Sequence, residues 1–437
     1  AVFEQDIYYW WTEPAERAAE MSRREVAETD WADEVEAVGE SFADLFLAIS
    51  RYDFSEVRGD PLGELYQRYF DSETRRRLGE FYTPPSLVEY AVDAVEFERS
   101  ESTRLLDPAC GSGTFLVEAI KKHKTEIDRD EVYWPDELRR MTERGGFIGL
   151  DIHPFAVVLA QIRVMVEILP EYRDAIDEDP TMVLKRLPIF RTDSLYNESV
   201  GQERGQGQQR LTTNHEKNLF EFETELPVKS DDEFVAMQFS FPQFSRVRKK
   251  TATEIDRRQE YFVWMQAVFD VVKQQTANDQ TSPDTELLSE QFGDYFGDDV
   301  TVEMAVSPFE ETASNLLDTF DELQEEYDDG RLVKLVEDLV LGALVKNSLK
   351  YDYVVGNPPW VDKQTKTRET DDRQEMQMKQ QFVTAWGETD PYMQFTERAL
   401  GMLREGGRLG FVIPNRVFKN EGARSLRGLL ATNRIHE

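Results

Sequence analysis

Two short motifs in this chain combine residue types that could together move a small group from one molecule to another. The first is the turn Asp107-Pro-Ala-Cys-Gly-Ser-Gly113, and the second is the loop Asn357-Pro-Pro-Trp360. Gly111 and Gly113 lack Cβ atoms, so a ligand can approach the backbone of the turn closely. The amide oxygen of Asn357 can accept a hydrogen bond from an amino group. The pair is suited to methyl transfer, with a methyl donor held at the turn and an amine held at the loop.

The elements around the turn indicate a ligand-binding edge of a sheet. Thr103–Leu106 is typical of a short buried strand, and Thr114–Ile120 has the apolar spacing of a helix. In open α/β sheets, ligands bind beyond the carboxyl ends of the strands, where this turn lies. A single glycine turn is weak evidence, because many strand-to-helix turns hold no ligand. We expect ligand contacts from Asp107, Pro108, Ala109, Cys110, Gly111 and Gly113.

Two further predicted strands end in a carboxylate. Phe147–Asp151 predicts a second strand, and Leu187–Leu195 predicts a third strand with Asp193 at its tip. In a Rossmann-like sheet, an acid at the second strand end accepts hydrogen bonds from ribose hydroxyls. Asp193 would stand where an adenine amino group could donate to it. For each Asp alone, helix capping is an equally good interpretation. The predicted nucleoside site includes Asp151 and Ile152 after the second strand, and Asp193 and Ser194 after the third.

A fourth predicted strand, Tyr351–Val355, leads into the second motif. Its two prolines stiffen the loop and remove two backbone donors, so nearby carbonyls can serve a ligand. The Asn357 side-chain oxygen and the Pro358 carbonyl could both accept from one NH2 group, which localises the nitrogen lone pair for attack on a sulfonium methyl. Trp360 offers a flat face on which a base could stack. The alternative is a rigid turn with a core tryptophan. The expected catalytic residues are Asn357, Pro358, Pro359 and Trp360.

In this order, the motifs resemble those of N6-adenine DNA methyltransferases of the gamma arrangement, in which the cofactor motif precedes the catalytic motif. Within that group, the chain looks most like the Eco57I-type restriction-modification methylases. The resemblance also covers Asp60–Tyr66 and Gly79–Pro85, where Thr83 takes the position that contacts the methionine carboxylate of the cofactor. Asp390–Phe395 and Gly406–Asn415 resemble the helix and the strand that follow the catalytic motif.

The resemblance implies an α/β fold with a Rossmann-like S-adenosylmethionine-dependent methyltransferase sheet. Apart from the resemblance, helical patterns in the sequence predict an N-terminal helical region and a large, mainly helical insertion. The resemblance implies S-adenosyl-L-methionine as the cofactor, with Asp151 at the ribose and Asp193 at the adenine. It also implies double-stranded DNA as the substrate, with the target adenine flipped out of the duplex. The implied partners are a nuclease domain or other subunits of a defence system. No metal site is implied.

The chain departs from the family pattern in three respects. Trp360 stands where family members often have Tyr or Phe, which preserves stacking but changes the width of the pocket. The second aromatic residue that contacts the flipped base, and the C-terminal target-recognition domain, are not found before Glu437. Because the chain also starts at Ala1 rather than at Met, we expect it to be an internal part of a longer protein.

Two other classes of function stay open. Enzymes that methylate RNA adenine or a protein glutamine amide could use the same Asn-Pro-Pro-aromatic geometry, because each substrate presents an NH2 group on an sp2 carbon. The size of the N-terminal region and of the insertion favours DNA, since those enzymes tend to be compact. The third interpretation is a non-catalytic subunit of a defence complex, and the intact Asn357–Trp360 motif argues against it.

The charge of the chain is unusual for a protein that binds DNA. It has 86 acidic and 51 basic residues, which gives a formal net charge of −35, whereas phosphate binding ordinarily needs a basic surface. An acidic excess is typical of proteins that work in high salt, where self-repulsion is screened. We therefore expect a halophilic, haloarchaeal source. Basic clusters at Arg75–Arg77 and Arg246–Lys250 could contact phosphate, although a solvated helix face is an equal alternative.

The motifs divide the chain into four regions. Residues 1–75 form a predicted N-terminal helical region, 76–196 the cofactor-binding half of the core, 197–346 an insertion, and 347–437 the catalytic half. Cys110 is the only cysteine, so an internal disulfide is excluded, and we expect it to be a small packing residue. No apolar run approaches the ~20 residues of a membrane span, and no secretory signal is evident. We expect a cytoplasmic protein without membrane contact.

Overall fold

A computed structural model describes most of the chain after residue 82. The described residues are 83–98, 103–129, 131–195, 210–214, 219–227, 234–242, 254–277, 284, 286–288, 312–320, 331–360, 378–379, 381–385 and 390–433. The chain divides into two units, Ala1–Pro61 and Leu62–Glu437, and all of the described residues belong to the second. The predicted N-terminal helical region, the segments 60–66 and 79–82, and both basic clusters lie outside the described residues.

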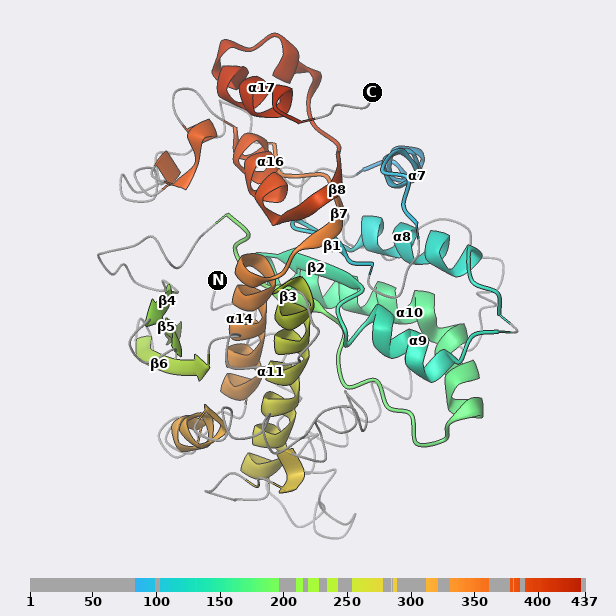
Figure 1. Ribbon diagram of the computed structural model, residues 1–437, viewed down its shortest axis with the longest axis vertical. Coiled ribbons are helices and arrows are strands. Elements are labelled where there is room, and N and C mark those ends of the chain that lie inside the picture. Colours follow the sequence, from blue (N-terminus) through green and yellow to red (C-terminus); the bar gives the residue numbers. More distant parts are fainter. Residues whose placement is uncertain are drawn as a thin grey trace, which may run out of the picture. The chain divides into compact units, whose positions relative to one another are not determined.

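A parallel sheet of five strands forms the centre of the described structure (Figure 1). The strand order is β3-β2-β1-β7-β8. The bounds are β1 Leu105–Asp107, β2 Phe147–Asp151, β3 Ile189–Arg191, β7 Tyr351–Gly356 and β8 Leu403–Phe411. The order confirms the predicted Rossmann-like α/β fold, and it places β1 and β7, which carry the two motifs, side by side with Leu105 opposite Tyr353. The carboxyl ends of these two strands therefore meet at one edge of the sheet.

Helices cover both faces of this sheet. The helices on one face are α7 Pro85–Ala94, α8 Thr114–Thr125, α9 Trp134–Met141 and α10 Pro154–Glu178, and those on the other face are α11 Glu254–Ala277, α14 Arg331–Ser348 and α16 Pro391–Met402. Figure 1 shows α8 and α10 on one side of the strands and α11 and α14 on the other. Consecutive strand residues serve opposite layers, because side chains alternate along a strand. Leu105 packs with the first layer, and Leu106 packs with the second.

Part of the predicted insertion contributes to the core of the sheet. Within residues 197–346, buried side chains of α11, of the helical segment 312–320 and of α14 join one apolar cluster with the sheet. A buried ionic network joins Arg186, which lies just before β3, to the helices α11 and α14 of this layer. Arg186 donates from Nη2 to Asp270 Oδ1 at 2.5 Å and also to Glu337 Oε1, and it donates from Nη1 to Gln266 at 3.1 Å. These described helices therefore form the second layer of the α/β core, and α14 runs two residues beyond the predicted boundary at 346.

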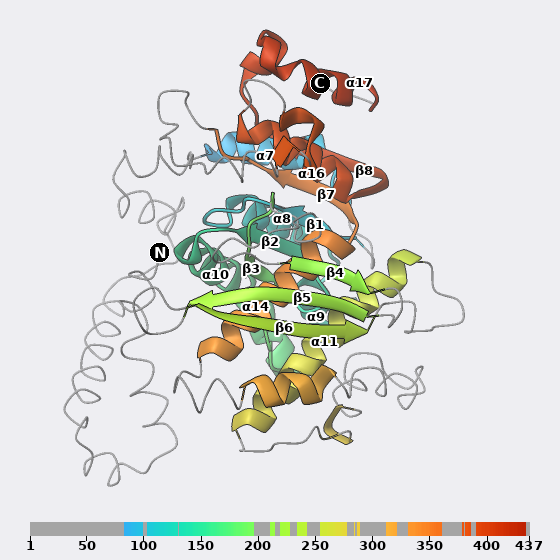
Figure 2. The ribbon, with the colours of Figure 1, turned by 90° about the vertical axis from the view of Figure 1, so that its left-hand side faces the viewer.

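A second sheet lies within the same segment, and the sequence analysis did not predict it. Its strands are β4 Arg210–Asn214, β5 Leu219–Pro227 and β6 Phe234–Pro242. They are antiparallel in the order β4-β5-β6 (Figure 2). Apolar and polar residues alternate over Phe220–Glu223 and Met237–Phe241, which is the pattern of a strand. The segment 197–346 is therefore a mixture of helix and sheet in its described parts.

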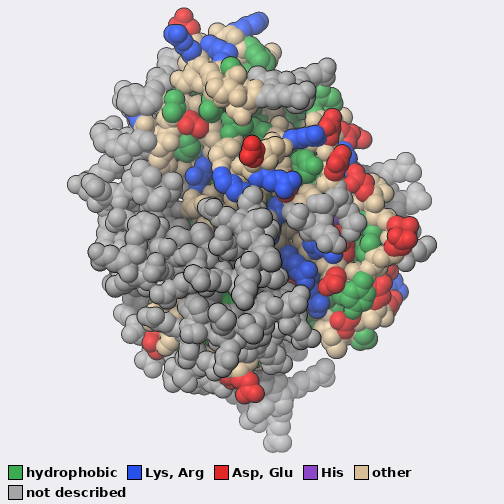
Figure 3. All heavy atoms as spheres, viewed as in Figure 1, with side chains coloured by type: hydrophobic (Ala, Val, Ile, Leu, Met, Phe, Trp, Pro, Cys, Tyr) green, Lys and Arg blue, Asp and Glu red, His purple; other side chains and the backbone are tan. Residues whose placement is uncertain are grey.

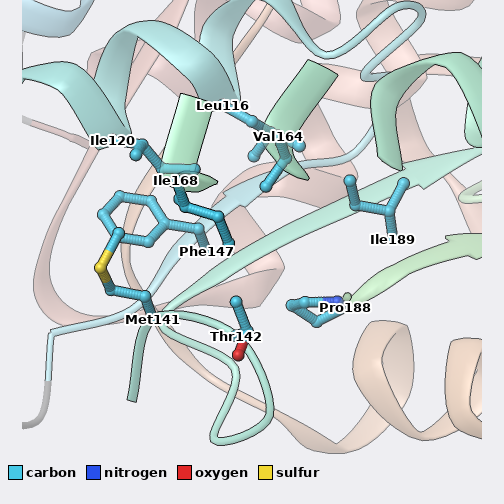
Figure 4. A pocket seen from close by; sticks show the side chains of 9 residues that line it. All are labelled: Leu116, Ile120, Met141, Thr142, Phe147, Val164, Ile168, Pro188 and Ile189. Atoms are coloured by element: carbon cyan, nitrogen blue, oxygen red, sulfur yellow. The ribbon is translucent and has the colours of Figure 1, made fainter. Parts of the chain in front are cut away.

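One small cavity lies inside the first layer (Figure 4). It measures about 10 Å³, which is roughly the smallest space that can hold one water. Its lining is Leu116, Ile120, Met141, Thr142, Phe147, Val164, Ile168, Pro188 and Ile189. The hydroxyl of Thr142, the polar side chain among them, donates to the carbonyl of Leu138 at 2.7 Å. The cavity is a packing void of the core and is too small for a nucleoside.

The described structure can be compared with two expectations from composition, namely basic residues on an acidic protein and the lack of a membrane span. On the face shown in Figure 3, the described surface carries Lys and Arg side chains as well as Asp and Glu side chains. Local positive charge therefore coexists with the net charge of −35. Among the helices that are described, none combines the length and the apolar character needed to cross a membrane.

Candidate active site

The carboxyl ends of β1 and β7 bring the two motifs into contact. β1 ends at Asp107, and β7 ends at Gly356. A Cβ atom on Gly356 would stand 2.7 Å from Asp107 Oδ1, and the φ of Gly356 is +152°. Such a distance leaves no room for a side chain, so the position directly before Asn357 requires glycine. The turn 107–113 and the loop 357–360, named here the cofactor turn and the catalytic loop after their predicted roles, are thus packed against each other at this point.

A hydrogen bond joins the predicted catalytic residue to a predicted cofactor residue. Asn357 donates from Nδ2 to Thr83 Oγ1 at 2.9 Å. Thr83 is buried and directly precedes Pro84, the residue that caps α7. The bond orients the amide so that its nitrogen faces Thr83 and its oxygen faces away. Thr83, Asp107 and Asn357, which are far apart in the sequence, therefore converge at one place.

The cofactor turn has the backbone geometry that the glycines predicted. Gly111 has a φ of +51° and Gly113 a φ of +81°, and Gly113 caps the N-terminus of α8. A Cβ atom on Gly113 would come within 3.0 Å of Ala160 Cβ on α10. Both the positive φ and the close approach of α10 therefore require glycine at Gly113, and the positive φ favours it at Gly111.

Asp151 contacts the cofactor turn directly. Its Oδ2 accepts from the backbone N–H of Gly111 at 2.8 Å, and its Oδ1 accepts from that of His153 at 2.8 Å. Burial raises the pKa of this carboxyl, and the two backbone hydrogen bonds oppose the shift. Each oxygen of a carboxylate can accept more than one hydrogen bond. Asp151 thus shapes the turn and can accept further hydrogen bonds, while Ile152 beside it is 63% exposed.

Asp107 is fully buried, and this gives the site an unusual electrostatic character. Its Oδ1 accepts from the backbone N–H of Ala109 at 3.1 Å. Among the described residues, its Oδ2 has no hydrogen-bond partner. Burial raises the pKa of Asp107 to about 8, the Ala109 bond lowers it, and repulsion from Asp151 adds to the rise. A buried carboxyl oxygen of this kind fits a polar ligand that forms a hydrogen bond with it, and a carboxyl that holds its proton can donate as well as accept.

The exit of β3 lies beside the same turn. Ser194 donates from Oγ to the carbonyl of Pro108 at 2.5 Å. Asp193 is exposed, and its Oδ1 accepts from the backbone N–H of Leu195 at 2.9 Å. The predicted residues of the third strand tip therefore contact the first motif. The strand itself is shorter than the predicted Leu187–Leu195.

Two buried cations that the sequence analysis missed support these loops. Arg163 on α10 donates from Nη1 to the carbonyl of Ser112 at 2.7 Å, to Ser112 Oγ at 2.8 Å and to Thr114 Oγ1 at 3.0 Å. Lys346 on α14 donates to the loop after β3. Charged residues are almost never fully buried without partners. No local pattern marks these two as buried, so the signal is visible only in the fold.

Cys110 is a packing residue, as the sequence analysis expected. It is 5% exposed, and a Cβ atom on Gly149 would stand 3.1 Å from its sulfur. Burial raises the pKa of the thiol, and repulsion from Asp151 and Asp107 adds to the rise. A raised pKa disfavours the thiolate, so this cysteine is poorly suited to act as a nucleophile.

Trp360 links the catalytic loop to the C-terminal part of the described structure. Its half-buried ring packs against an apolar cluster from α16, η5 Asn415–Phe418 and α17 Arg424–Ala431. Asp390, which caps α16, is buried and pairs with Arg416 at 3.3 Å. Part of the tryptophan is therefore used in packing. Its stacking role and the roles of Pro358 and Pro359 remain predictions.

Two family models match the chain across this site. Residues 57–184 match the model described as N-6 DNA Methylase, and residues 146–437 match that of the Eco57I restriction-modification methylase. The chain belongs to the Eco57I restriction-modification methylase family. The first match includes Thr83 and Asp107, and the second includes Asn357. The predicted resemblance to Eco57I-type methylases is confirmed, while the haloarchaeal source stays a prediction.

Curated relatives of this Eco57I-family chain are restriction-modification proteins. It is 37% identical over 81 residues to the Type I restriction enzyme MjaVII methylase subunit of Methanocaldococcus jannaschii, covering 18% of this chain and 14% of that protein. It is 28% identical over 107 residues to the Type II restriction enzyme and methyltransferase RM.Eco57I of Escherichia coli, covering 24% and 11%. The matched segments thus span a small part of each relative.

A solved structure of a DrdV–DNA complex is also similar to this Eco57I-family chain. The TM-score is 0.40 at 14% sequence identity, and the similarity covers 93% of this chain and 29% of the other. A score this low supports no inference about fold or function.

Proposed function

We propose that this chain methylates the N6 amino group of adenine in double-stranded DNA, with S-adenosylmethionine as the methyl donor. The reaction would serve a restriction-modification or related defence system, together with a nuclease domain or other subunits. The observation that carries the proposal is the hydrogen bond from Asn357 to Thr83, beside the contact of Gly356 with Asp107. It supports a site in which a methyl donor and an amine would meet.

The residues of the cofactor turn fit a nucleoside with a charged, hydrogen-bonding tail. Gly111 and Gly113 leave the backbone open to a ligand, and the buried Oδ2 of Asp107 would form a hydrogen bond with it. Asp151 would accept from the ribose hydroxyls, and Asp193 would accept from the adenine amino group. When bound, S-adenosylmethionine supplies a methyl group on a positively charged sulfur.

The catalytic loop would hold the target amine. The Oδ1 of Asn357 and the carbonyl of Pro358 would accept the two hydrogens of N6, which directs the nitrogen lone pair away from the ring. Thr83 holds the other end of the amide, so the oxygen is already oriented before the base arrives. Positioning of this kind is a large part of catalysis in group transfer. After transfer, the amine loses one proton to solvent.

The target base must leave the duplex to reach this loop. Flipping costs a few kcal/mol, and stacking on an aromatic ring offsets about 1–3 kcal/mol per base. Trp360 would provide that ring, on the part of its surface that does not pack against α16 and α17. Pro359 would limit the motion of the loop between the amine site and the ring.

The substrate class can be tested by competition. Full-length protein would be mixed with labelled S-adenosylmethionine and with equal amounts of unmodified duplex DNA, RNA and a glutamine-containing protein, in high and low KCl. We expect the label in DNA, and we expect Asn357→Ala to abolish it. Label in RNA or in protein would contradict the proposal. Cofactor binding without any transfer would instead indicate a non-catalytic subunit of a defence complex.

A further inference from the structure

The described part of the loop after β3, residues 192–195, is held from several sides, and within it only the side chain of Asp193 is exposed. Thr192, Ser194 and Leu195 around it are all buried. Thr192 donates its backbone N–H to the carbonyl of Asp151 at 2.8 Å. Ser194 is bonded to the cofactor turn through Pro108. The loop therefore presents one carboxylate on an otherwise buried segment.

Lys346 holds the remaining side of this loop. Lys346 is only 2% exposed. Its Nζ donates to Thr192 Oγ1 at 3.0 Å and to the backbone carbonyl of Asp193 at 2.8 Å. Leu195 in turn donates its N–H to Asp193 Oδ1 at 2.9 Å. Both the backbone and the carboxylate of Asp193 are thus fixed in direction.

The helix that carries Lys346 is anchored in its last turn. Arg398 on α16 donates from Nη2 to the carbonyl of Lys346 at 3.1 Å and to Asn347 Oδ1 at 2.6 Å. Gly342, one turn before Lys346, packs against Thr192, because a Cβ atom there would stand 3.2 Å from Thr192 Cβ. The position of the Lys346 ammonium group is therefore fixed by the contacts of α14 with Arg398 and Thr192.

We propose that Lys346 is a positioning residue that holds Asp193 where it accepts a hydrogen bond from the 6-amino group of the cofactor purine. This inference rests on the proposed function, and it names the residue on which purine selectivity depends. A carboxylate held in a fixed direction favours binding of a purine with a 6-amino group, because that group donates a hydrogen bond to it. It disfavours a purine with a 6-oxo group, because two acceptors would then face each other. A loop without its Lys346 bonds can turn Asp193 away, so the selectivity falls.

The test compares two ligands that differ only at this position of the purine. The dissociation constants of S-adenosylhomocysteine and S-inosylhomocysteine, its 6-oxo analogue, would be measured by calorimetry for the wild-type protein and for Lys346→Met. We expect the preference of the wild type for the adenosyl ligand to fall about tenfold or more in the variant, which corresponds to the loss of one or two buried hydrogen bonds. Most of this fall should come from weaker binding of S-adenosylhomocysteine, with little change in the dissociation constant of S-inosylhomocysteine.

A matched control lies four residues along the chain. Lys350 also donates from Nζ to a backbone carbonyl, but this carbonyl belongs to Gly401 on α16. Lys350→Met should leave the preference unchanged. Should Lys346→Met fail to fold, Thr192→Val removes one of the two acceptors and keeps the shape of the side chain, and it should lower the preference by a smaller factor.

The outcomes separate the inference from the proposed function. A wild-type protein that binds neither ligand would contradict the proposed function itself. A wild type that prefers the adenosyl ligand, with Lys346→Met weakening both ligands by the same factor, would overturn the inference and leave a purely structural role. Non-additive effects of Lys346→Met and Asp193→Ala on the preference are expected, because the two residues act through one contact.

Discussion

Asn357 and Thr83 form a hydrogen bond of 2.9 Å across a separation of 274 residues. Asn357 follows β7, which lies between β1 and β8 in the sheet, and Thr83 precedes the helix α7. The bond uses the amide nitrogen, and the proposed catalytic role uses the amide oxygen at the other end of the group. The orientation of the predicted catalytic group thus depends on a residue that the sequence places in the cofactor-binding half.

Replacement of Asn357 separates catalysis from cofactor binding. We expect Asn357→Ala to lower kcat by about 100-fold or more, as for loss of a polar group that positions a reacting atom. The dissociation constant of S-adenosylhomocysteine should change little, because the cofactor turn keeps its bonds. Thr83→Val should cost about 1 kcal/mol of transition-state stabilisation, because the Asn357 amide loses the hydrogen bond that orients it. Equal losses of cofactor affinity and kcat in Asn357→Ala would argue against this assignment.

Glycine is required at Gly356 for steric reasons. Gly356→Ala would place a Cβ atom 2.7 Å from Asp107 Oδ1, at a φ of +152°. We expect it to lower the free energy of unfolding by roughly 1–3 kcal/mol and to weaken cofactor binding. Urea denaturation and calorimetry would measure the two effects.

Gly401→Ala is the matched control for this substitution. Gly401 lies in α16, and a Cβ atom there would have nothing within 4 Å. Alanine is the better helix former by up to about 1 kcal/mol, so this variant should be as stable as the wild type or more so. Destabilisation of both variants by the same amount would remove the steric explanation.

The buried carboxyl of Asp107 predicts a pH dependence of stability. Its pKa rises from 3.8 to about 8 on folding, chiefly through burial. The folded state therefore holds a proton that the unfolded chain releases between these values, and stability falls as pH rises from about 4 to about 8. Asp107→Asn removes this ionisation, so the free energy of unfolding of the variant should rise relative to that of the wild type as pH increases from about 4 to about 8.

Urea denaturation of the cofactor-free protein at several pH values would measure the effect. Glu89→Gln, at an exposed position on α7, removes one negative charge from the same protein and serves as the control. A stability difference between Asp107→Asn and wild type that is the same at both ends of the window would show that Asp107 ionises normally in the folded protein.

Arg163 should matter for the cofactor rather than for the chemical step. Arg163→Gln loses the bonds that join α10 to Ser112 and Thr114, so the cofactor turn becomes less ordered. We expect KM for S-adenosylmethionine to rise about tenfold with a smaller change in kcat, on the scale of one or two buried charge-assisted hydrogen bonds. Arg163→Lys should restore part of the loss. Arg173→Gln, at an exposed position of the same helix, should have no effect.

The strands of the site could be predicted because their signals are local. Phe147–Asp151 was predicted with the bounds that the structure shows, and the predicted strand Tyr351–Val355 differs from β7 by one residue. Short apolar runs that end in a glycine or an acid are typical of buried parallel strands. The glycine turn at Gly111–Gly113 was predictable for the same reason, since backbone constraints act within a few residues.

The second helical layer could not be assigned from local pattern. α11 and α14 carry apolar residues on most sides in their buried parts, and this feature does not say which surface they cover. Their place depends on contacts such as that between Arg186 and Glu337, which are 151 residues apart. The buried roles of Arg163 and Lys346 were missed because charged residues are expected at the surface. Parts of β5 and β6 alternate apolar and polar residues, but these runs are short, and the sequence prediction for residues 197–346 is a mainly helical insertion.

The most direct test of the account is the identity of the methylated atom. Unmodified duplex DNA would be incubated with the full-length protein and labelled S-adenosylmethionine in high salt, digested to nucleosides and separated by chromatography with mass detection. The account predicts N6-methyladenine as the labelled nucleoside, and it predicts none with Asn357→Ala. Label in a methylated cytosine, or N6-methyladenine that persists in the variant, would contradict it.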